Sequence, residues 1–586
     1  MILQVSKIRA FAFGIACLFF AQGSLAQILD VQLRGIEGEL RENALAWLGD
    51  APQTPQARAN YLYAAEKRVQ QSLQALGYYR ADIELDLTRG REQWTLVITV
   101  VPGAPVEIRK LDVRVLGEAG SDEAFQVLLD DPGLAPGDVF NHGRYEQFRR
   151  RLAALAQQRG YFDARFEKRL VTVEPIGGAV DISLHFDSGQ RYAFGALRFD
   201  QDIIREELLQ PLLNTTEGEP FDQQRLRETQ AQLQRTGYFS TVLLVPELDQ
   251  AEQGTVPLEL QLFPAKRHSF DVGVGFSTDT RERVSLTWRT PKLNRLGHSQ
   301  ETRLQYSSIN PSGRFTYSIP MTHPLNDIFQ LTARLEDNEF GDLDSHQKEL
   351  GLRREFRRDA WIYSYSLRGL NESWNSTGLR RQNDYLLPGF SLSQRRRTGS
   401  LVNPDSGFSQ WYRVEAGHSD FGSDIDLVRL SANYGYIFSL GEKHRVVLRS
   451  DLGAALLSDG DRSDLAPSLS FFAGGSQSIR GFSYQSIGNE ITVEDEGGQE
   501  RTLVVGGERL ATVSAEYQYS FTPSWRGSVF MDGGDAFDEG EFDANYGAGF
   551  GVHYVTQVGA IRLEFANPLS KDNPSWRMHL AIGAEF

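Results

Sequence analysis

Cysteine is almost absent from this chain of 586 residues. The single one, Cys17, lies in a short apolar stretch, residues 10–20, which follows two basic residues and precedes a small-x-small sequence at positions 24–26. This order is typical of a secretory signal peptide, so we expect residues 1–26 to be removed and the mature chain to start at Gln27. A membrane anchor is the alternative, but the stretch is too short for one. The mature chain then excludes disulfides, thiol catalysis and cysteine-ligated zinc.

Long apolar runs and an excess of basic residues are also missing. After residue 26 no run approaches the roughly 20 apolar residues that a membrane-spanning helix needs. Lys and Arg number 61 against 77 Asp and Glu, a net charge of −16, whereas a nucleic-acid-binding protein carries a basic patch. We therefore expect no nucleic-acid partner. Methionine is rare at 4 residues, but glycine is frequent at 55 and aromatic residues make up 11%, as in large β proteins with many turns.

The motifs of common enzyme classes are missing as well. The sequence has no Gly-x-Ser-x-Gly elbow, no Walker loop and no His-Glu-x-x-His motif. The ten histidines are scattered without metal-ligand spacing. We therefore expect no enzymatic activity, no catalytic residues, no cofactor and no bound metal.

Three repeats are present in the first half of the chain. Gly77, Gly160 and Gly237, each followed by two aromatic residues, recur 83 and 77 residues apart. Each follows a segment whose apolar residues keep to one helix face, and alternating strand-like segments come after it. Glycine suits the left-handed turn that ends a helix. Each repeat is therefore predicted to run strand, helix, helix, strand, strand.

This arrangement resembles polypeptide-transport-associated (POTRA) domains. The resemblance divides the region into residues 27–105, 106–190 and 191–265. It implies a periplasmic arm that binds client chains or partners at the edges of its sheets. Such binding is physically reasonable, because an edge strand offers unpaired N–H and C=O groups to an extended peptide.

Residues 266–586 have a different pattern, in which apolar residues alternate with polar or small ones. The clearest segment is the last, where Trp576, Met578 and Leu580 alternate with Arg577 and His579. Segments of this kind, about ten residues long, are the signature of transmembrane β-barrels. Sixteen can be counted, which predicts a 16-stranded antiparallel barrel after the α+β repeats. A soluble β-sandwich would not need so many apolar outward faces, and a passive porin would not need three periplasmic modules.

One connection in the barrel is much longer than the others. It covers residues 458–509, and loops beyond about 15 residues are usually functional. Within it lies Arg480, while the strand alternation places Glu516 and Asp532 on the lumenal face. An arginine and two carboxylates shielded from water would form a strong ion-pair cluster. The alternative is that Arg480 belongs to a solvated loop.

Two motifs favour the ion-pair cluster. Ile479-Arg480-Gly481-Phe482 resembles the V/I-R-G-F loop tip of the BamA/TamA superfamily of outer-membrane barrels, and Phe530-Met531-Asp532-Gly533-Gly534 resembles its F-x-D-x-G strand motif. The resemblance implies that the loop folds back into the barrel. It makes Asp532 the main partner of Arg480 and Glu516 a second candidate. The implied role is structural locking of the loop.

The number of repeats distinguishes branches of this superfamily. Three repeats on a sixteen-stranded barrel resemble the TamA branch, the outer-membrane subunits of translocation and assembly modules. This implies a Gram-negative outer membrane, POTRA domains in the periplasm, and help in inserting client outer-membrane proteins such as autotransporters. A TamB-like protein anchored in the inner membrane and outer-membrane lipid are the other implied partners. Phospholipid transport with such a partner, or two-partner secretion, are the alternatives.

The first and last barrel strands predict a weak seam. Gly273 and Gly275 lie on the inner face of the first strand, and the last strand carries Gly583 and ends at Phe586. Glycines weaken strand pairing because they offer no side chain to pack. We hypothesise that the seam opens sideways to template a client strand. The alternative is that these glycines only avoid crowding the lumen.

Overall fold

The computed structural model describes residues 28–90, 93–376, 379–400, 403–458, 461–494, 500–556, 559–571 and 574–583. The expected signal peptide, residues 1–26, lies outside this part of the chain, as does Phe586. By contacts the chain divides into two units, one with the first two repeats and part of the third, the other with the rest of the third and the barrel. None of the helices in the described ranges is long and apolar enough to cross a membrane.

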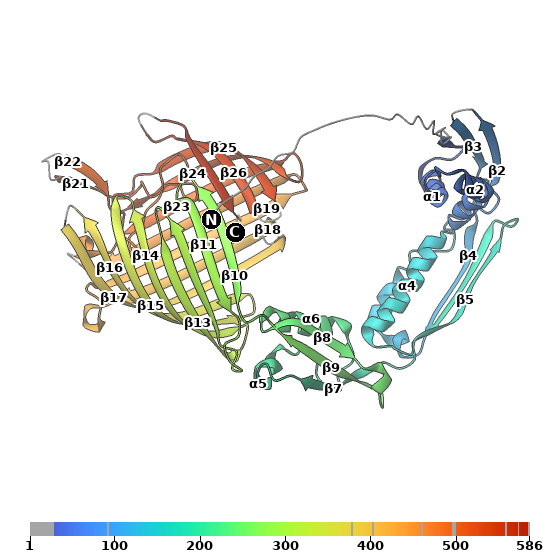
Figure 1. The fold of residues 1–586 in the computed structure, drawn as a ribbon, viewed down its shortest axis with the longest axis horizontal. Coiled ribbons are helices and arrows are strands. Elements are labelled where there is room, and N and C mark those ends of the chain that lie inside the picture. The colour runs from blue at the N-terminus through green and yellow to red at the C-terminus, as the bar shows by residue number, and fades with distance from the viewer. Residues whose placement is uncertain are drawn as a thin grey trace, which may run out of the picture. The chain divides into compact units, whose positions relative to one another are not determined.

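Each repeat folds as a three-stranded sheet with two helices, in the order predicted from the sequence (Figure 1). The last strand of each repeat lies in the middle of its sheet, which leaves the second strand at one edge. The first repeat consists of β1 (Ile28–Arg34), α1 (Gly38–Leu48), α2 (Pro55–Ala75), β2 (Asp82–Arg89) and β3 (Gln93–Val101). The second consists of β4 (Glu107–Leu116), α3 (Glu123–Asp130), α4 (His142–Arg159), β5 (Arg165–Glu174) and β6 (Ala179–Asp187). The third consists of β7 (Ala193–Asp200), α5 (Glu206–Leu209), α6 (Gln223–Arg235), β8 (Phe239–Pro246) and β9 (Thr255–Pro264).

The three repeat glycines end the second helix of each repeat. Gly77, Gly160 and Gly237 have positive φ angles of 92°, 85° and 73°, which side chains with a Cβ rarely adopt. The helix faces predicted from periodicity are buried: Val69 of α2 and Leu152 of α4 are both 0% exposed. The repeats therefore place glycine where the chain must leave the helix and turn into the next strand.

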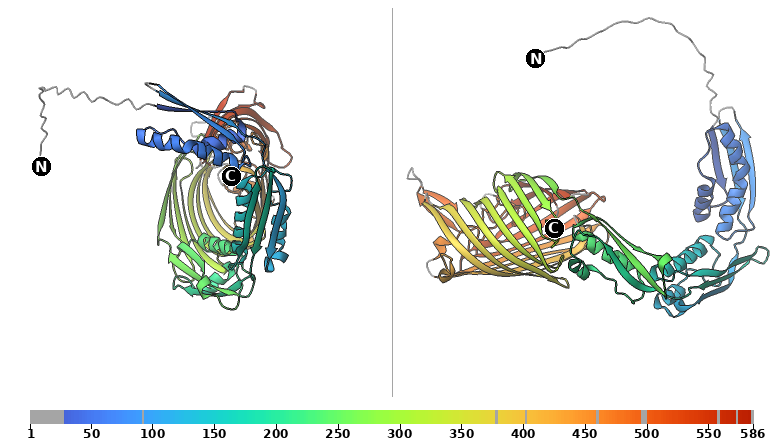
Figure 2. Two further views of the ribbon diagram at one scale, coloured as in Figure 1. Left: turned by 90° about the vertical axis from the view of Figure 1, so that its right-hand side faces the viewer. Right: turned by 60° about the horizontal axis from the view of Figure 1, so that its bottom comes forward.

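The second half forms a closed barrel of sixteen antiparallel strands around one lumen (Figures 1 and 2). This confirms the predicted fold class and strand number. Alternate residues face outward, as β23 shows: Val513 and Tyr517 are 59% and 40% exposed, whereas Ser514 and Glu516 are 4% and 7% exposed. The strands are β10 (Ser269–Ser277), β11 (Arg281–Thr290), β12 (Ser299–Ser307), β13 (Ser312–His323), β14 (Asp327–Phe340), β15 (Leu343–Arg358), β16 (Trp361–Ser376), β17 (Leu379–Gly399), β18 (Pro404–Gly417), β19 (Leu427–Leu440), β20 (His444–Leu457), β23 (Arg509–Ser520), β24 (Trp525–Phe537), β25 (Asn545–Thr556), β26 (Gly559–Pro568) and β27 (Arg577–Gly583).

The long loop connects β20 to β23 and packs against the barrel wall. It contains a small hairpin of its own, β21 (Glu490–Glu494) and β22 (Glu500–Val504). It covers residues 458–508, because β20 ends at Leu457 and Arg509 already pairs with Phe537 of β24. Its apolar side chains are buried in two clusters with wall residues. From the loop these clusters take Leu465, Ala466, Leu469, Phe471, Ala473, Ile479, Phe482 and Ile487.

Candidate functional site: the arginine of the long loop

Arg480 is the centre of a buried polar cluster. Its side chain is 1% exposed. Nε and Nη2 donate to the two carboxylate oxygens of Asp532 at 2.7 and 2.8 Å, and the backbone N–H of Arg480 donates to the same carboxylate at 3.0 Å. Nη1 donates to Glu516 at 2.6 Å and to Glu564 at 3.1 Å, and Nη2 also donates to Ser514 Oγ at 3.2 Å. The structure thus brings together the predicted arginine and both predicted carboxylates.

The pleat of the barrel wall explains why these partners converge. Side chains two residues apart on a strand share a face, so Ser514 and Glu516 of β23 both point into the lumen. The register pairs Ser514 with Asp532 and Glu516 with Phe530 of β24. The guanidinium carbon lies 3.4 Å from the centre of the Phe530 ring, a cation–π contact. The F-x-D motif therefore supplies an aromatic face and a carboxylate to the same cation.

Glycine allows the loop tip to approach the wall closely. Gly481 has a φ of 95°, and a Cβ at this position would lie 2.9 Å from the backbone nitrogen of Pro568. On β25, a Cβ at Gly547 would lie 1.9 Å from the carbonyl oxygen of Arg480. Either substitution would push the loop tip and the wall apart.

The other motif residues surround this contact. Ile479 and Phe482 are 0% and 2% exposed and pack with Ala536 of β24. Gly533 and Gly534 follow Asp532 in β24, where they pair with Val513 and Thr512. Because glycine has no Cβ, the backbone of β24 can lie close to that of β23 at these positions; a Cβ on Gly534 would lie 2.1 Å from the carbonyl oxygen of Ala511.

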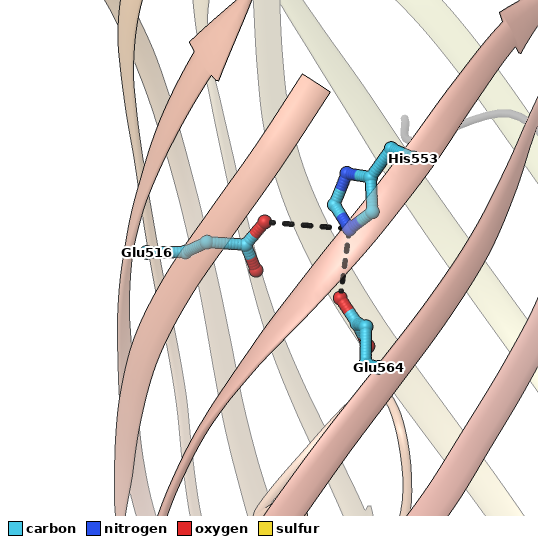
Figure 3. Close-up of side chains that lie close together, drawn as sticks. All are labelled: Glu516, His553 and Glu564. Atoms are coloured by element: carbon cyan, nitrogen blue, oxygen red, sulfur yellow. Dashed lines mark hydrogen bonds and ion pairs between the residues drawn. The ribbon is translucent and has the colours of Figure 1, made fainter. Parts of the chain in front are cut away.

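A histidine and two carboxylates of the cluster are close enough together to hold a metal ion (Figure 3). His553 Nε2 lies 3.1 Å from Glu564 and 3.9 Å from Glu516, and the three possible ligand atoms are within 4.8 Å of one another. Nη1 of Arg480 already donates to both carboxylates. The three residues therefore form part of the arginine site, where the guanidinium supplies the positive charge.

This site is suited to holding the loop tip in place rather than to transferring protons. Three carboxylates converge on one permanently charged guanidinium, which cannot act as an acid or base at neutral pH. Removing one partner from a buried ion pair costs about 3–5 kcal/mol, because the remaining charge is left uncompensated. The site is suited to fixing the loop tip against β23, β24 and β26.

In the part of the chain that the structure describes, the seam is the least paired junction of the barrel. Among the described residues, β10 and β27 share one register pair, Ser277 with Ala581, next to a hydrogen bond of 3.0 Å from Thr278 N to Leu580 O. By comparison, β10 pairs with β11 along its whole length, from Ser269 to Ser277.

The predicted seam glycines differ in their surroundings. Gly583 pairs with Ala560 of β26 on the side of β27 away from β10. A Cβ on Gly273 would lie 2.7 Å from Ser285 Oγ, whereas a Cβ on Gly275 would have no described heavy atom within 4 Å. Crowding by Ser285 therefore accounts for a glycine at position 273, whereas the described residues impose no such constraint at position 275.

Sequence reasoning missed several members of the site. Glu564 could have been found, because Arg562 and Glu564 alternate along β26 with apolar Ile561 and Leu563. The contacts of the loop with Asp279 and His579 had no signal in the sequence. They depend on the path of the loop through the lumen.

Comparisons with known proteins agree with this architecture. The model of the Omp85 superfamily domain matches residues 265–586. The model described as "POTRA domain TamA domain 1" matches residues 30–102, and the "Surface antigen variable number repeat" POTRA model matches residues 108–189 and 192–263. These matches cover all three repeats and the whole barrel region.

Individual relatives and a solved structure are also similar. The chain is 24% identical to the outer membrane protein assembly factor BamA of Nitratidesulfovibrio vulgaris over 66% of its length, and spans 49% of that relative. It is 20% identical to BamA of Neisseria meningitidis over 86% of its length and 70% of that relative. The crystal structure of BamA from Haemophilus ducreyi lacking POTRA domains 1–3 matches with a TM-score of 0.67 at 16% identity, covering 81% of this chain and 99% of that one. The chain belongs to the Omp85 superfamily, as a β-barrel of the Gram-negative outer membrane with its POTRA domains in the periplasm.

Proposed function

We propose that this protein is a non-enzymatic factor that inserts other proteins into the outer membrane, or secretes them, at the seam between β10 and β27. The observation that carries the proposal is the single register pair of that seam among the described residues. Among the described residues, most backbone N–H and C=O groups on this side of β10 have no strand partner. Such an edge can template a strand of a client protein.

The comparisons support a role of this kind. Two relatives carry the name "Outer membrane protein assembly factor". The match of residues 30–102 to a TamA-type POTRA domain, and the number of repeats, favour a TamA-like protein. We accordingly propose a subset of outer-membrane proteins, including autotransporters, as clients and a TamB-like inner-membrane protein as partner. The edge strands β2, β5 and β8 are the proposed docking sites for extended segments of these proteins.

A disulfide across the seam tests the proposal. Ser277 and Ala581 face each other in register, and cross-strand pairs approach to about 4.5–5.5 Å between Cβ atoms, close to what a disulfide requires. The double variant Ser277→Cys/Ala581→Cys, in a mature chain without other cysteines, would close the seam. A strain lacking the native protein then reports autotransporter display with the disulfide formed and reduced.

We expect the oxidised double variant to fail in display and reduction to restore it. The matched control is Ser364→Cys/Ser391→Cys, which crosslinks β16 to β17, a strand pair away from the seam where no opening is proposed. Oxidation of this control should leave display unchanged. If the closed seam supports full display, the insertion mechanism is wrong, and the barrel acts as an anchor or conduit.

A further inference from the structure

The long loop contacts the first side of the seam through Asp279. This residue lies in the turn between β10 and β11. Its Oδ2 accepts two hydrogen bonds from Ser476, one from the backbone N–H at 2.8 Å and one from the hydroxyl at 2.6 Å. The side chain of Asp279 is 9% exposed, so water competes little for these bonds. Bonds to a charged acceptor are stronger than those between neutral groups.

The same loop contacts the other side of the seam through His579. This residue belongs to β27, and its side chain is 2% exposed. Its Nε2 accepts a hydrogen bond of 3.0 Å from the backbone N–H of Gly481. An imidazole nitrogen that accepts has no proton, so the proton of a neutral His579 lies on Nδ1. That atom is 3.8 Å from Asp279 Oδ1, and the carboxylate favours this tautomer.

We propose that Asp279 and His579 are positioning residues that tie the loop tip to both sides of the seam. The inference rests on the proposed function, to which it adds a control of seam opening. Three hydrogen bonds from Ser476 and Gly481 reach the two residues. Among the described residues, the two strands share one register pair and the hydrogen bonds between Thr278 and Leu580. The loop therefore adds a brace across the seam that is comparable in number of hydrogen bonds to the direct pairing.

The contact with His579 is coupled to the arginine site because the two residues of the loop that make these contacts are adjacent. Gly481 directly follows Arg480, whose backbone N–H donates to Asp532. As long as Arg480 stays bound to Asp532, Gly481 can move only a short distance away from His579. Opening the seam thus requires either breaking the two contacts with Asp279 and His579 or withdrawing the whole loop tip from the lumen.

The test measures seam opening without any client. The full chain carrying Ala581→Cys is reconstituted in phospholipid vesicles, and the rate of labelling by a water-soluble maleimide is measured. Asp279→Ala and His579→Leu should each raise this rate about tenfold or more, as expected for loss of hydrogen bonds of about 1.5–3 kcal/mol to a charged group or of a buried acceptor. His579→Gln, whose carbonyl oxygen can accept from Gly481, should restore a rate near that of the parent.

Asp271→Ala is the matched control, because Asp271 is a carboxylate of β10 that pairs with Arg289 of the neighbouring strand and not with the loop. In the Asp271→Ala variant, the cysteine at position 581 should be labelled at the same rate as in the parent. Ser476→Ala removes one donor and serves if the other variants do not assemble; it should raise the rate about threefold to tenfold. Parent rates in Ser476→Ala and in the assembled variants of Asp279 and His579 would overturn the proposal.

The outcome is separable from that of the proposed function. If labelling rises in the Asp279 and His579 variants but a disulfide-closed seam still supports display, the role of the loop in holding the seam is supported and the proposed insertion function is rejected. If the closed seam abolishes display but the variants are labelled like the parent, the proposed insertion function is supported and the role of the loop in holding the seam is rejected.

Discussion

Arg480 and Asp532 form a two-pronged ion pair in which Nε and Nη2 of the arginine reach separate oxygens of one carboxylate, at 2.7 and 2.8 Å. The two residues are 52 positions apart and belong to the long loop and to β24. Planar, parallel hydrogen bonds of this kind fix orientation as well as distance. They hold the loop tip in one position against the barrel wall.

Replacing Arg480 should release the loop. Arg480→Ala leaves Asp532, Glu516 and Glu564 without their shared cation, so we expect the free energy of unfolding to fall by about 3–5 kcal/mol. Urea unfolding of the purified protein measures the loss, and cleavage of the loop by added protease reports its release. Arg480→Lys keeps the charge but cannot donate to both oxygens of Asp532 in the same way. It should give an intermediate loss.

The control for this prediction is Arg303→Ala, which removes an exposed arginine of β12. Substitutions of exposed residues usually change stability by less than about 0.5 kcal/mol. Equal effects of Arg303→Ala and Arg480→Ala would show that the buried cluster does not stabilise the loop.

Adding one methyl group at Gly547 should displace the loop tip without changing any charge. The Cβ of Gly547→Ala would fall 1.9 Å from the carbonyl oxygen of Arg480, whereas Gly275→Ala would place its Cβ in open space among the described residues. We expect Gly547→Ala to become sensitive to protease within the loop and Gly275→Ala to resist like the parent. Overpacking costs about 1–3 kcal/mol. A protease-resistant Gly547→Ala would mean that the wall yields instead of the loop.

In the second repeat, Asp122 should contribute stability that depends on pH. Burial alone would raise the pKa of Asp122, but hydrogen bonds from Arg159, the backbone N–H of Ala124 and Tyr161 outweigh it and hold the pKa below its usual range. Burial, together with the Asp122 carboxylate, raises the pKa of Tyr161 to about 12, so Tyr161 remains a donor. Stability from Asp122 is therefore complete above its unfolded pKa, about 3.9, and is lost as the pH falls through the lower folded value.

Hydrogen exchange of the α4 amides measures this contribution. Asp122→Asn should lower the free energy of unfolding of the repeat at pH 7 by about 1.5–3 kcal/mol and weaken its dependence on pH below about 4. Asp131→Asn, at the other end of α3 and exposed, is the matched control and should change little. Identical pH profiles for Asp122→Asn and the parent would contradict the prediction.

Much of this fold was predictable because both halves are periodic. The repeat glycines mark where helices end, and the alternation of side chains fixes which face of each strand is lumenal. The same alternation places Glu516 and Asp532 in the lumen, since a pleated strand leaves no other choice for these positions. These are local consequences of backbone geometry, and one sequence is enough to derive them.

The contacts across the seam were not predictable in this way. Ser476 and Asp279 are 197 positions apart, and Gly481 and His579 are 98 apart. Their meeting depends on how an irregular loop passes through the lumen, which no periodicity encodes. Alternation shows that a carboxylate faces inward, but not which loop residue it meets.

Removing Arg480 should also turn part of the cluster into a site for a divalent cation. In the parent, Nη1 of Arg480 donates to Glu516 and Glu564. Without it, those carboxylates and His553 Nε2 present three possible ligand atoms within 4.8 Å of one another. Zinc accepts histidine nitrogen and carboxylate oxygen at about 2.0–2.2 Å, so small side-chain movements would bring all three atoms onto one ion.

We therefore expect Zn²⁺ to raise the thermal midpoint of Arg480→Ala but not that of the parent. Binding to the folded state alone stabilises it by about 2.7 kcal/mol when free zinc is 100 times the dissociation constant. The double variant Arg480→Ala/His553→Ala loses one ligand and should respond much less. An equal zinc response in the double variant would place the ion elsewhere on the barrel. An equal rise of the thermal midpoint in the parent would mean that zinc displaces the guanidinium of Arg480 from the two carboxylates.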